Sequence, residues 1–316
     1  MTSDPPGLDL RRLAEHLERE GLTRGPLTAE LITGGRSNLT YVVRDAAGTL
    51  VVRRPPLGHV LATAHDMGRE FRVMSALRDA PVPVPRTYHL CEDPGVVGAP
   101  FYVMEHVAGD RPPMTPALAR ELAGVLAALH SIDPESVGLG DFGRPAGFLE
   151  RQVSRWKRQL DASRGRAVPG MDELYERLAA RVPPSGPPAI VHGDFKLGNT
   201  LVADGRITAV LDWEMSTVGD PLTDLALFLL YGEVGALDNG PPGDPPDFHE
   251  LAGHYQAVSG RDLSRLGWYV GLACFKLAVI AEGIHVRYTR GLTVGDGFAE
   301  VGDQVALLVD RGLREV

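Results

Sequence analysis

The chain has 316 residues, which is enough for two lobes because single hydrophobic cores stop growing near ~250–300 residues. Hydrophobic residues make up 44% of the composition and charged residues 23%, which excludes a wholly disordered chain. Acidic residues outnumber basic ones by 41 to 32. The resulting formal charge of -9 disfavours nucleic acids and anionic membrane surfaces as partners.

Two cysteines, Cys91 and Cys274, cannot form a disulfide framework or a cysteine-rich zinc site. The ten histidines show no helical i,i+4 pair with a third ligand, which also disfavours zinc. The first six residues contain an acidic residue and prolines where a signal peptide has basic and then apolar residues. The most apolar stretch, residues 269–281, is interrupted by Lys276 and is expected to be too short to span a bilayer. We therefore expect a soluble, cytoplasmic protein.

Short apolar runs separated by turn residues predict a β-rich lobe over residues 1–108. A helix is expected at 8–20, where Leu10, Leu13 and Leu17 have helical spacing, and another at 64–78. The expected strands cover residues 31–32, 39–44, 50–54, 87–91 and 101–106.

Longer helical patterns predict a larger, mostly helical lobe over residues 109–316. A strand is expected at 189–191, followed by a hairpin whose turn is Asp204-Gly205, between 200–202 and 207–211. The expected helices cover residues 116–130, 147–160, 171–181, 221–231, 248–258, 266–289 and 298–313. The sequence thus predicts an α+β fold with a small antiparallel sheet lobe and a larger helical lobe.

Four polar residues lie at diagnostic spacings around the expected hairpin: Asp194, Lys196 two positions later, Asn199 and Asp212. Residues 192–199 read HGDFKLGN and residues 211–214 read LDWE. Asp194 and Asn199 are five positions apart, and Asp212 lies thirteen beyond Asn199. This is the spacing of the protein-kinase catalytic loop and of the magnesium-binding aspartate that follows it. The segment resembles the aminoglycoside phosphotransferase family, whose related members include choline, homoserine and fructosamine kinases.

The resemblance implies a bilobal protein-kinase-like fold that binds ATP (or GTP) and Mg²⁺ and phosphorylates a hydroxyl of a small molecule. In that chemistry the carboxylate of Asp194 accepts the proton of the acceptor hydroxyl, and Lys196 offsets charge on the transferring group. Asn199 and Asp212 provide the hard oxygen ligands that Mg²⁺ prefers. His192 is expected to fix the loop through hydrogen bonds.

The nucleotide-binding residues are expected in the first lobe. Small residues between two strands resemble the family's shortened glycine-rich loop: Gly34, Gly35, Ser37 and Asn38. The next strand has two arginines where the family has a lysine for the phosphates. Strand alternation favours Arg53, with Arg54 as the alternative, and Glu70 is the expected ion-pair partner.

The segment between the lobes is expected to bind the base. By resemblance, Met104 flanks the adenine, while the C=O of Glu105 and the N–H of Val107 pair with it. Further along, Asp220 and Asp224 belong to a Gly-Asp-Pro-x-x-Asp element and are expected to be structural, bracing the catalytic loop.

Two alternatives remain open from the sequence. Because the lysine is missing, one alternative is a nucleotide-binding pseudokinase module. The presence of Asp194, Asn199 and Asp212 argues against it. A metal-dependent phosphoesterase that uses Asp194, Asp212 and His192 would need no nucleotide. The Arg-Arg-Pro-Pro stretch at 53–56 is similar to a subgroup related to the kinase-like domain of acyl-CoA dehydrogenase fusion proteins, which favours a hydroxyacyl or other metabolic acceptor over an antibiotic.

Overall fold

The computed structural model describes residues 4–32, 38–46, 48–58, 66–234, 247–291 and 301–316. It divides into two compact units, and one of them is discontinuous in sequence. The sheet unit comprises Met1–Arg111 together with Asn199–Ser216, and the helical unit comprises Pro112–Gly198 together with Thr217–Val316. The two units are described separately below.

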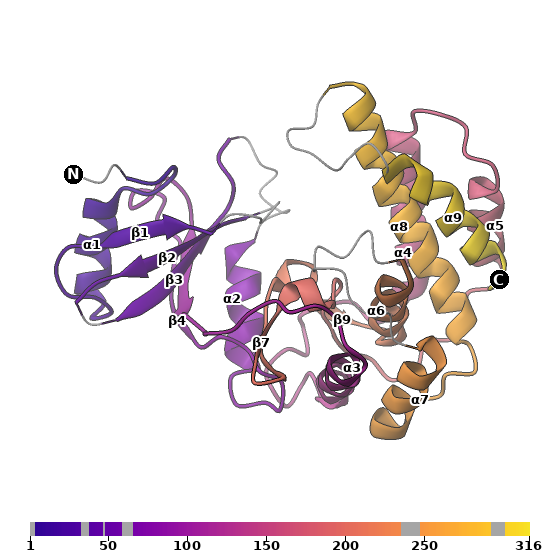
Figure 1. Ribbon diagram of the computed structural model, residues 1–316, viewed down its shortest axis with the longest axis horizontal. Helices are drawn as coiled ribbons and strands as arrows, with labels where there is room; N and C mark the ends of the chain where they lie inside the picture. Colours follow the sequence, from indigo (N-terminus) through magenta and orange to yellow (C-terminus); the bar gives the residue numbers. More distant parts are fainter. Residues whose placement is uncertain (1–3, 33–37, 47, 59–65, 235–246, 292–300) are drawn as a thin grey trace. The chain divides into compact units, whose positions relative to one another are not determined.

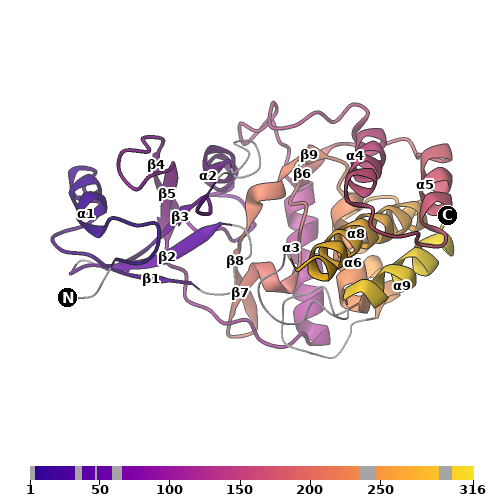
Figure 2. The ribbon, with the colours of Figure 1, turned by 90° about the horizontal axis from the view of Figure 1, so that it is seen from above.

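The sheet unit is built on a five-stranded antiparallel sheet in the order β1-β2-β3-β5-β4. Its strands are β1 (Thr28–Leu31), β2 (Leu39–Arg44), β3 (Thr49–Arg54), β4 (Thr87–Cys91) and β5 (Phe101–Glu105). Helices α1 (Leu10–Arg19) and α2 (Met67–Ala76) lie on either side of β4 and β5 (Figure 2). Aspartates cap both helices: Asp9 accepts from the backbone N–H of Arg12, and Asp66 accepts from that of Arg69.

Strand alternation explains why two helices cover this sheet. Val52 and Val103 belong to the core cluster that includes Leu13 and Leu17 of α1. Their neighbours in sequence, such as Tyr102, point to the other face, where α2 packs. One face therefore holds an apolar core, and the other holds polar groups.

A hairpin from later in the chain completes the sheet unit. Strands β7 (Thr200–Ala203) and β8 (Arg206–Val210) are joined by the predicted Asp204-Gly205 turn, in which both residues have positive φ. Val202 exchanges two backbone hydrogen bonds with Asp110, and the N–H of Val210 donates to the carbonyl of Pro83. The approach at Gly109 is close: a Cβ there would lie 3.1 Å from the backbone nitrogen of Val202.

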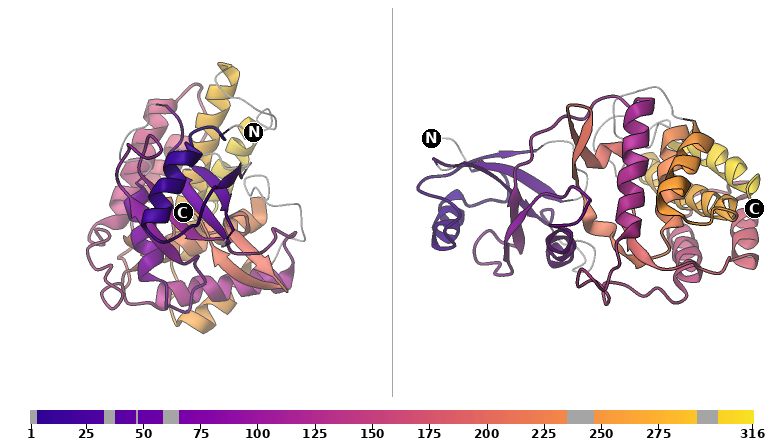
Figure 3. Two further views of the ribbon diagram at one scale, coloured as in Figure 1. Left: turned by 90° about the vertical axis from the view of Figure 1, so that its left-hand side faces the viewer. Right: turned by 90° about the horizontal axis from the view of Figure 1, so that it is seen from below.

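The centre of the helical unit is one long apolar helix, α8, and helices α4, α5, α6 and α9 pack against it (Figure 1). Helix α3 packs against α7 (Figure 3). Its helices are α3 (Pro116–Ser131), α4 (Phe148–Ser163), α5 (Met171–Ala180), α6 (Leu222–Val234), α7 (Phe248–Ser259), α8 (Leu266–Thr289) and α9 (Val301–Leu313). A two-stranded sheet pairs β6 (Ala189–Val191), which was predicted, with β9 (Thr217–Gly219). The sequence analysis did not predict strand β9.

Helix α8 has the predicted bounds and contains the apolar stretch 269–281. Its 24 residues are long and apolar enough to cross a membrane by length and composition, but 78% of its most apolar window is buried inside the protein. Lys276 interrupts this apolar stretch. That ammonium group is accommodated inside the unit, where it donates to the carbonyl of Gly193 at 2.8 Å and lies 5.6 Å from the ring centroid of Trp156.

Candidate active site

Arg53 on β3 is the centre of a polar cluster in the sheet unit. Its Nε lies 2.9 Å from Oε2 of Glu70, its Nη1 donates to the hydroxyl of Thr40 at 3.2 Å, and its Nη2 pairs with Asp212. Burial alone lowers the pKa of Arg53, but the neighbouring acidic groups outweigh burial and raise it. The expected ion pair with Glu70 is therefore present, and the cation is shared with Asp212.

Arg54 points away from this cluster. Its guanidinium donates to the carbonyl oxygens of Pro55, Gly7 and Val97, the last at 2.7 Å. Successive residues of a strand face opposite sides, so the structure brings Arg53 rather than Arg54 to the face that carries Glu70.

Glu70 is almost completely buried and receives hydrogen bonds from several side chains. The hydroxyl of Tyr102 donates to its Oε2 at 2.9 Å, and the amide of Asn38 donates to its Oε1 at 2.9 Å. Burial raises the pKa of Glu70 to about 7, against the opposing effect of Arg53. Burial and the nearby Glu70 also raise the pKa of Tyr102, so that its hydroxyl remains a donor.

Asn38, the last residue of the expected glycine-rich loop, connects this cluster to the segment after the hairpin. Its amide nitrogen also donates to Glu214 at 3.2 Å. Its Oδ1 is buried and, within the described part of the chain, has no hydrogen-bond partner. A buried acceptor without a donor is costly, so this oxygen suits a polar ligand. The other expected loop residues, Gly34, Gly35 and Ser37, lie outside the described residues.

The hairpin brings the two expected metal ligands to neighbouring positions. Thr200 pairs with Val210, and the N–H of Leu211 donates to the carbonyl of Asn199 at 2.8 Å. Asp212 follows directly, in the left-handed conformation (φ 66°, ψ 56°) that non-glycine residues rarely adopt. Asn199 and Asp212 therefore occupy neighbouring backbone positions at the base of the hairpin, and their side chains remain the predicted oxygen ligands.

The catalytic-loop motif lies in the helical unit and is fixed by a buried carboxylate. The backbone N–H groups of His192 and Gly193 donate to Asp224 at 2.6 and 2.8 Å. His192 accepts from the N–H of Asp194 at 3.2 Å, so it acts within the loop as expected. Burial alone raises the pKa of Asp224, but its hydrogen bond to His130 and the other polar neighbours lower it. The predicted brace by Asp224 is confirmed.

Asp220 is also structural. Its carboxylate accepts from the N–H of Leu222 at 3.1 Å, at the start of α6, and from the hydroxyl of Tyr269 at 2.8 Å. Capping the helix that contains Asp224 fixes the brace in turn.

Asp194 presents its carboxylate beside two side chains of the helical unit. The hydroxyl of Tyr231 donates to Oδ1 at 2.6 Å, and Nζ of Lys196 lies 3.2 Å from Oδ2. Lys196 also lies 4.8 Å from the ring centroid of Tyr231, while the Asp194 side chain remains 23% exposed. The arrangement leaves an oriented carboxylate within reach of solvent, as a proton acceptor requires.

Sequence reasoning missed Tyr231 and Lys276. Tyr231 lies on α6, which is apolar on all sides, and Lys276 lies on the equally apolar α8. Nothing in the pattern of α6 separates Tyr231 from core positions, whereas Lys276 was visible as the one charge that interrupts the apolar stretch 269–281. Burial lowers the pKa of Lys276, which holds the carbonyl of Gly193, next to Asp194.

The expected base-binding residues lie at the end of β5. Met104 is buried and pairs with Val51 of β3. Glu105 is exposed, and its N–H donates to the carbonyl of Arg86 at 2.8 Å. Val107 follows, half-buried, after the strand has ended. The carbonyl of Glu105 and the N–H of Val107 remain the predicted partners of the base.

Comparisons with known proteins agree with this geometry. A model of the phosphotransferase enzyme family matches residues 28–268. The chain is 35% identical to acyl-CoA dehydrogenase family member 11 of Gallus gallus, over 92% of this chain and 40% of that protein. It is 38% identical to family member 10 of Mus musculus, over 84% of this chain and 27% of that protein. The chain thus spans well under half the length of these relatives.

Solved structures show the same fold. A Ralstonia eutropha protein provisionally named an aminoglycoside phosphotransferase matches with a TM-score of 0.85 and 31% identity, over 97% of this chain and 98% of that one. An aminoglycoside phosphotransferase mutant in complex with ADP and hygromycin B matches with a TM-score of 0.64 and 17% identity, over 94% and 97%. The expected α+β protein-kinase-like fold is confirmed, as is the resemblance to the kinase-like segment of acyl-CoA dehydrogenase relatives.

Proposed function

The chain belongs to the phosphotransferase enzyme family, and we propose that it transfers the γ-phosphate of ATP to a hydroxyl of a small molecule in a reaction that depends on Mg²⁺. The observation that carries the proposal is the carboxylate of Asp194, which the braced loop holds beside Tyr231 and Lys196 while part of it stays exposed. There it takes the proton of the acceptor hydroxyl and orients the attacking oxygen, and Lys196 offsets charge on the transferring group.

Asn199 and Asp212 would hold the metal ion. Both residues carry side-chain oxygens and lie at the base of the hairpin. The buried oxygen of Asn38, which has no partner among the described residues, supports a polar ligand beside them. Bound Mg²⁺ would neutralise charge on the phosphates. Arg53 supplies the fixed positive charge that a lysine supplies elsewhere in the family. We propose that its guanidinium binds the α- and β-phosphates.

The relatives also favour a class of acceptor. The matching proteins are named for acyl-CoA dehydrogenases, and this chain corresponds to less than half of each. A kinase-like segment joined to such an enzyme supports a hydroxyacyl compound as the acceptor rather than an antibiotic.

The decisive experiment incubates the purified chain with ATP or GTP and Mg²⁺ over a panel of hydroxyacyl thioesters, hydroxy acids, aminoglycosides and macrolides. We expect one acceptor class to gain a single phosphate by intact mass, with matching release of ADP, and no product from the Asp194→Ala variant. Nucleotide binding without product across all classes would favour the pseudokinase module. Hydrolysis of phosphate esters without nucleotide would favour the phosphoesterase.

A further inference from the structure

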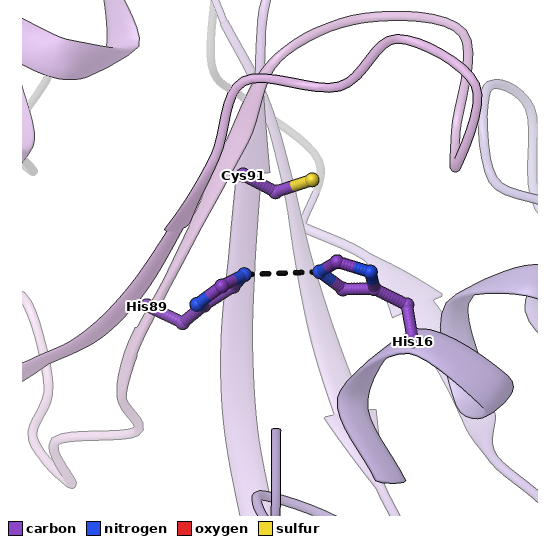
Figure 4. Close-up of side chains that lie close together, drawn as sticks. All are labelled: His16, His89 and Cys91. Carbon is purple, nitrogen blue, oxygen red and sulfur yellow. Dashed lines mark hydrogen bonds between the residues drawn. The ribbon is translucent and has the colours of Figure 1, made fainter. Parts of the chain in front are cut away.

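We propose that His16, His89 and Cys91 form a binding site for Zn²⁺ in the sheet unit. One ring nitrogen of each histidine and Sγ of the cysteine lie within 4.8 Å of one another, and the side chains converge from α1 and β4 (Figure 4). The site is separate from Asn199 and Asp212. Its ligands lie on the face of the sheet covered by α1, whereas Arg53 and its partner Asp212 belong to the other face.

The fold brings these three residues together for simple reasons of periodicity. His89 and Cys91 are two positions apart on β4, so both side chains point to the same face. His16 lies three residues after Leu13 on α1, on the side that packs against that face. Leu13, Leu17 and Cys91 share one buried cluster, which holds the helix against the strand.

The hydrogen bonds assign one tautomer to each imidazole. Nη2 of Arg19 lies 3.4 Å from Nδ1 of His16, and an arginine can only donate, so the His16 proton is on Nε2. That nitrogen donates to Nε2 of His89 at 2.9 Å, which places the His89 proton on Nδ1. A lone pair of His89 therefore already points into the site.

The second layer of contacts also resembles that of metal-binding histidines. Oε2 of Glu20 lies 3.7 Å from Nδ1 of His89, on the side of the ring opposite the site. This distance is longer than a hydrogen bond, so the carboxylate would have to move closer on metal binding to accept from Nδ1; there it would fix the tautomer and increase the basicity of the other nitrogen.

Two imidazoles and one thiolate suit Zn²⁺, and three protein ligands leave a fourth position for water. Bonds of about 2.0–2.3 Å place tetrahedral ligands roughly 3.3–3.7 Å apart, so binding draws Sγ inward. The Cys91 thiol loses its proton to solvent, while the His16 proton moves from Nε2 to Nδ1 and displaces Arg19. The bound ion would link α1 to the edge strand β4.

The test measures Zn²⁺ binding to the tag-free chain by competition with a chromogenic chelator, in the presence of excess Mg²⁺. We expect one tightly held equivalent, and a cobalt(II)-substituted protein with a thiolate charge-transfer band. Cys91→Ser should remove that band, and Cys91→Ser or His89→Gln should weaken Zn²⁺ binding by at least about 100-fold. Glu20→Gln should weaken it by about tenfold, because the carboxylate acts only through His89.

Matched controls keep the test specific. Cys274→Ser changes the buried cysteine of α8, and His249→Gln changes an exposed histidine of α7; both should retain the full equivalent. His89 is partly exposed, so its variant should fold even if the change at buried Cys91 does not. Zinc binding that survives both substitutions, or a wild-type chain that takes up no zinc, would overturn the proposal.

Discussion

Glu70 in the sheet unit and Asp194 in the helical unit are both carboxylates in polar clusters, but they are held in opposite ways. Glu70 is 1% exposed and is bound by Arg53, Tyr102 and Asn38, so its oxygens are saturated from within. The Asp194 side chain is 23% exposed. The first cluster is organised to hold charge in place, and the second to offer an oxygen to another molecule. Substitutions in the first should therefore alter nucleotide binding, and those in the second should alter turnover.

The largest effect is expected at Asp194. Replacement by alanine removes the proton acceptor, so turnover should fall by about 10²–10⁴-fold. Nucleotide affinity should stay within about twofold, because the sheet unit is untouched. Steady-state kinetics with a verified acceptor and calorimetric titration of ATP separate the two quantities. Turnover near that of the wild type would remove Asp194 from the mechanism.

The next effect is expected at Asp212. Asparagine tolerates the left-handed backbone conformation as aspartate does, so Asp212→Asn removes only the negative charge of the carboxylate. Affinity for ATP should fall by about tenfold or more when Mg²⁺ is present, and little when it is absent. Asp204→Asn is a matched control at the other aspartate of positive φ, which lies in the exposed hairpin turn. Equal losses with and without Mg²⁺ would contradict a metal role.

Arg53→Lys tests whether the arginine geometry matters. An ammonium group cannot keep the contacts to Glu70, Thr40 and Asp212 together, so the KM for ATP should rise by about tenfold, which corresponds to one charge-assisted hydrogen bond. Arg54→Lys, one residue along and facing the other side, should leave that KM unchanged. Equal changes of the KM for ATP in the two variants would show that the face of β3 on which an arginine lies does not decide whether it binds the nucleotide.

Tyr231→Phe should have a smaller effect. It removes one hydroxyl that orients Asp194, which is worth roughly 1 kcal/mol, so kcat should fall by about fivefold while the KM for ATP is unchanged. Tyr255→Phe removes a comparable buried hydroxyl, which bonds to His130, and should lower thermal stability without changing kcat. A change in the KM for ATP in the Tyr231 variant would place this residue in nucleotide binding instead.

The last prediction concerns the pH dependence of stability rather than activity. Because burial raises the pKa of Glu70 to about 7, the folded state binds a proton more readily than the unfolded state, so this stabilisation is present at low pH and is lost as the pH rises through about 7. Glu70→Gln removes this contribution. Between pH 5 and 8 the melting temperature of the wild type should fall by about 4–10 °C relative to the variant, because a pKa raised from 4.5 to about 7 corresponds to roughly 2–3 kcal/mol over this range. If the melting temperatures of the wild type and of Glu70→Gln changed in parallel with pH, Glu70 would not titrate between pH 5 and 8.

Local rules predicted much of the fold. Helix α8 and strands β4 and β6 begin and end where periodicity placed them, and Asp204-Gly205 forms the expected turn. Strand β9 was missed because it has only three residues and pairs with β6, far away in sequence. Alternation along β3 was sufficient to place the side chain of Arg53 on the face of the sheet that carries Glu70. This prediction succeeded because Arg53 lies in one regular strand and Glu70 in one regular helix.

Contacts between distant segments were the part that the sequence did not reveal. Tyr231 reaches Asp194 from a helix with no polar face, and His16 reaches His89 from a helix 73 residues earlier. A search for ligands at fixed spacing within one helix cannot find such a pair. Tertiary packing, rather than local pattern, decides these positions.

The discontinuous sheet unit has a consequence for the order in which the protein folds during synthesis. When residues 1–111 have left the ribosome, the backbone groups of Asp110 and Pro83 still lack the hairpin strands that they bond to. Those partners arrive only after residues 112–198 have been made. A fragment that stops at residue 111 would therefore leave these groups without their partners. To produce this half of the protein alone, residues 199–216 would have to be attached through a new linker.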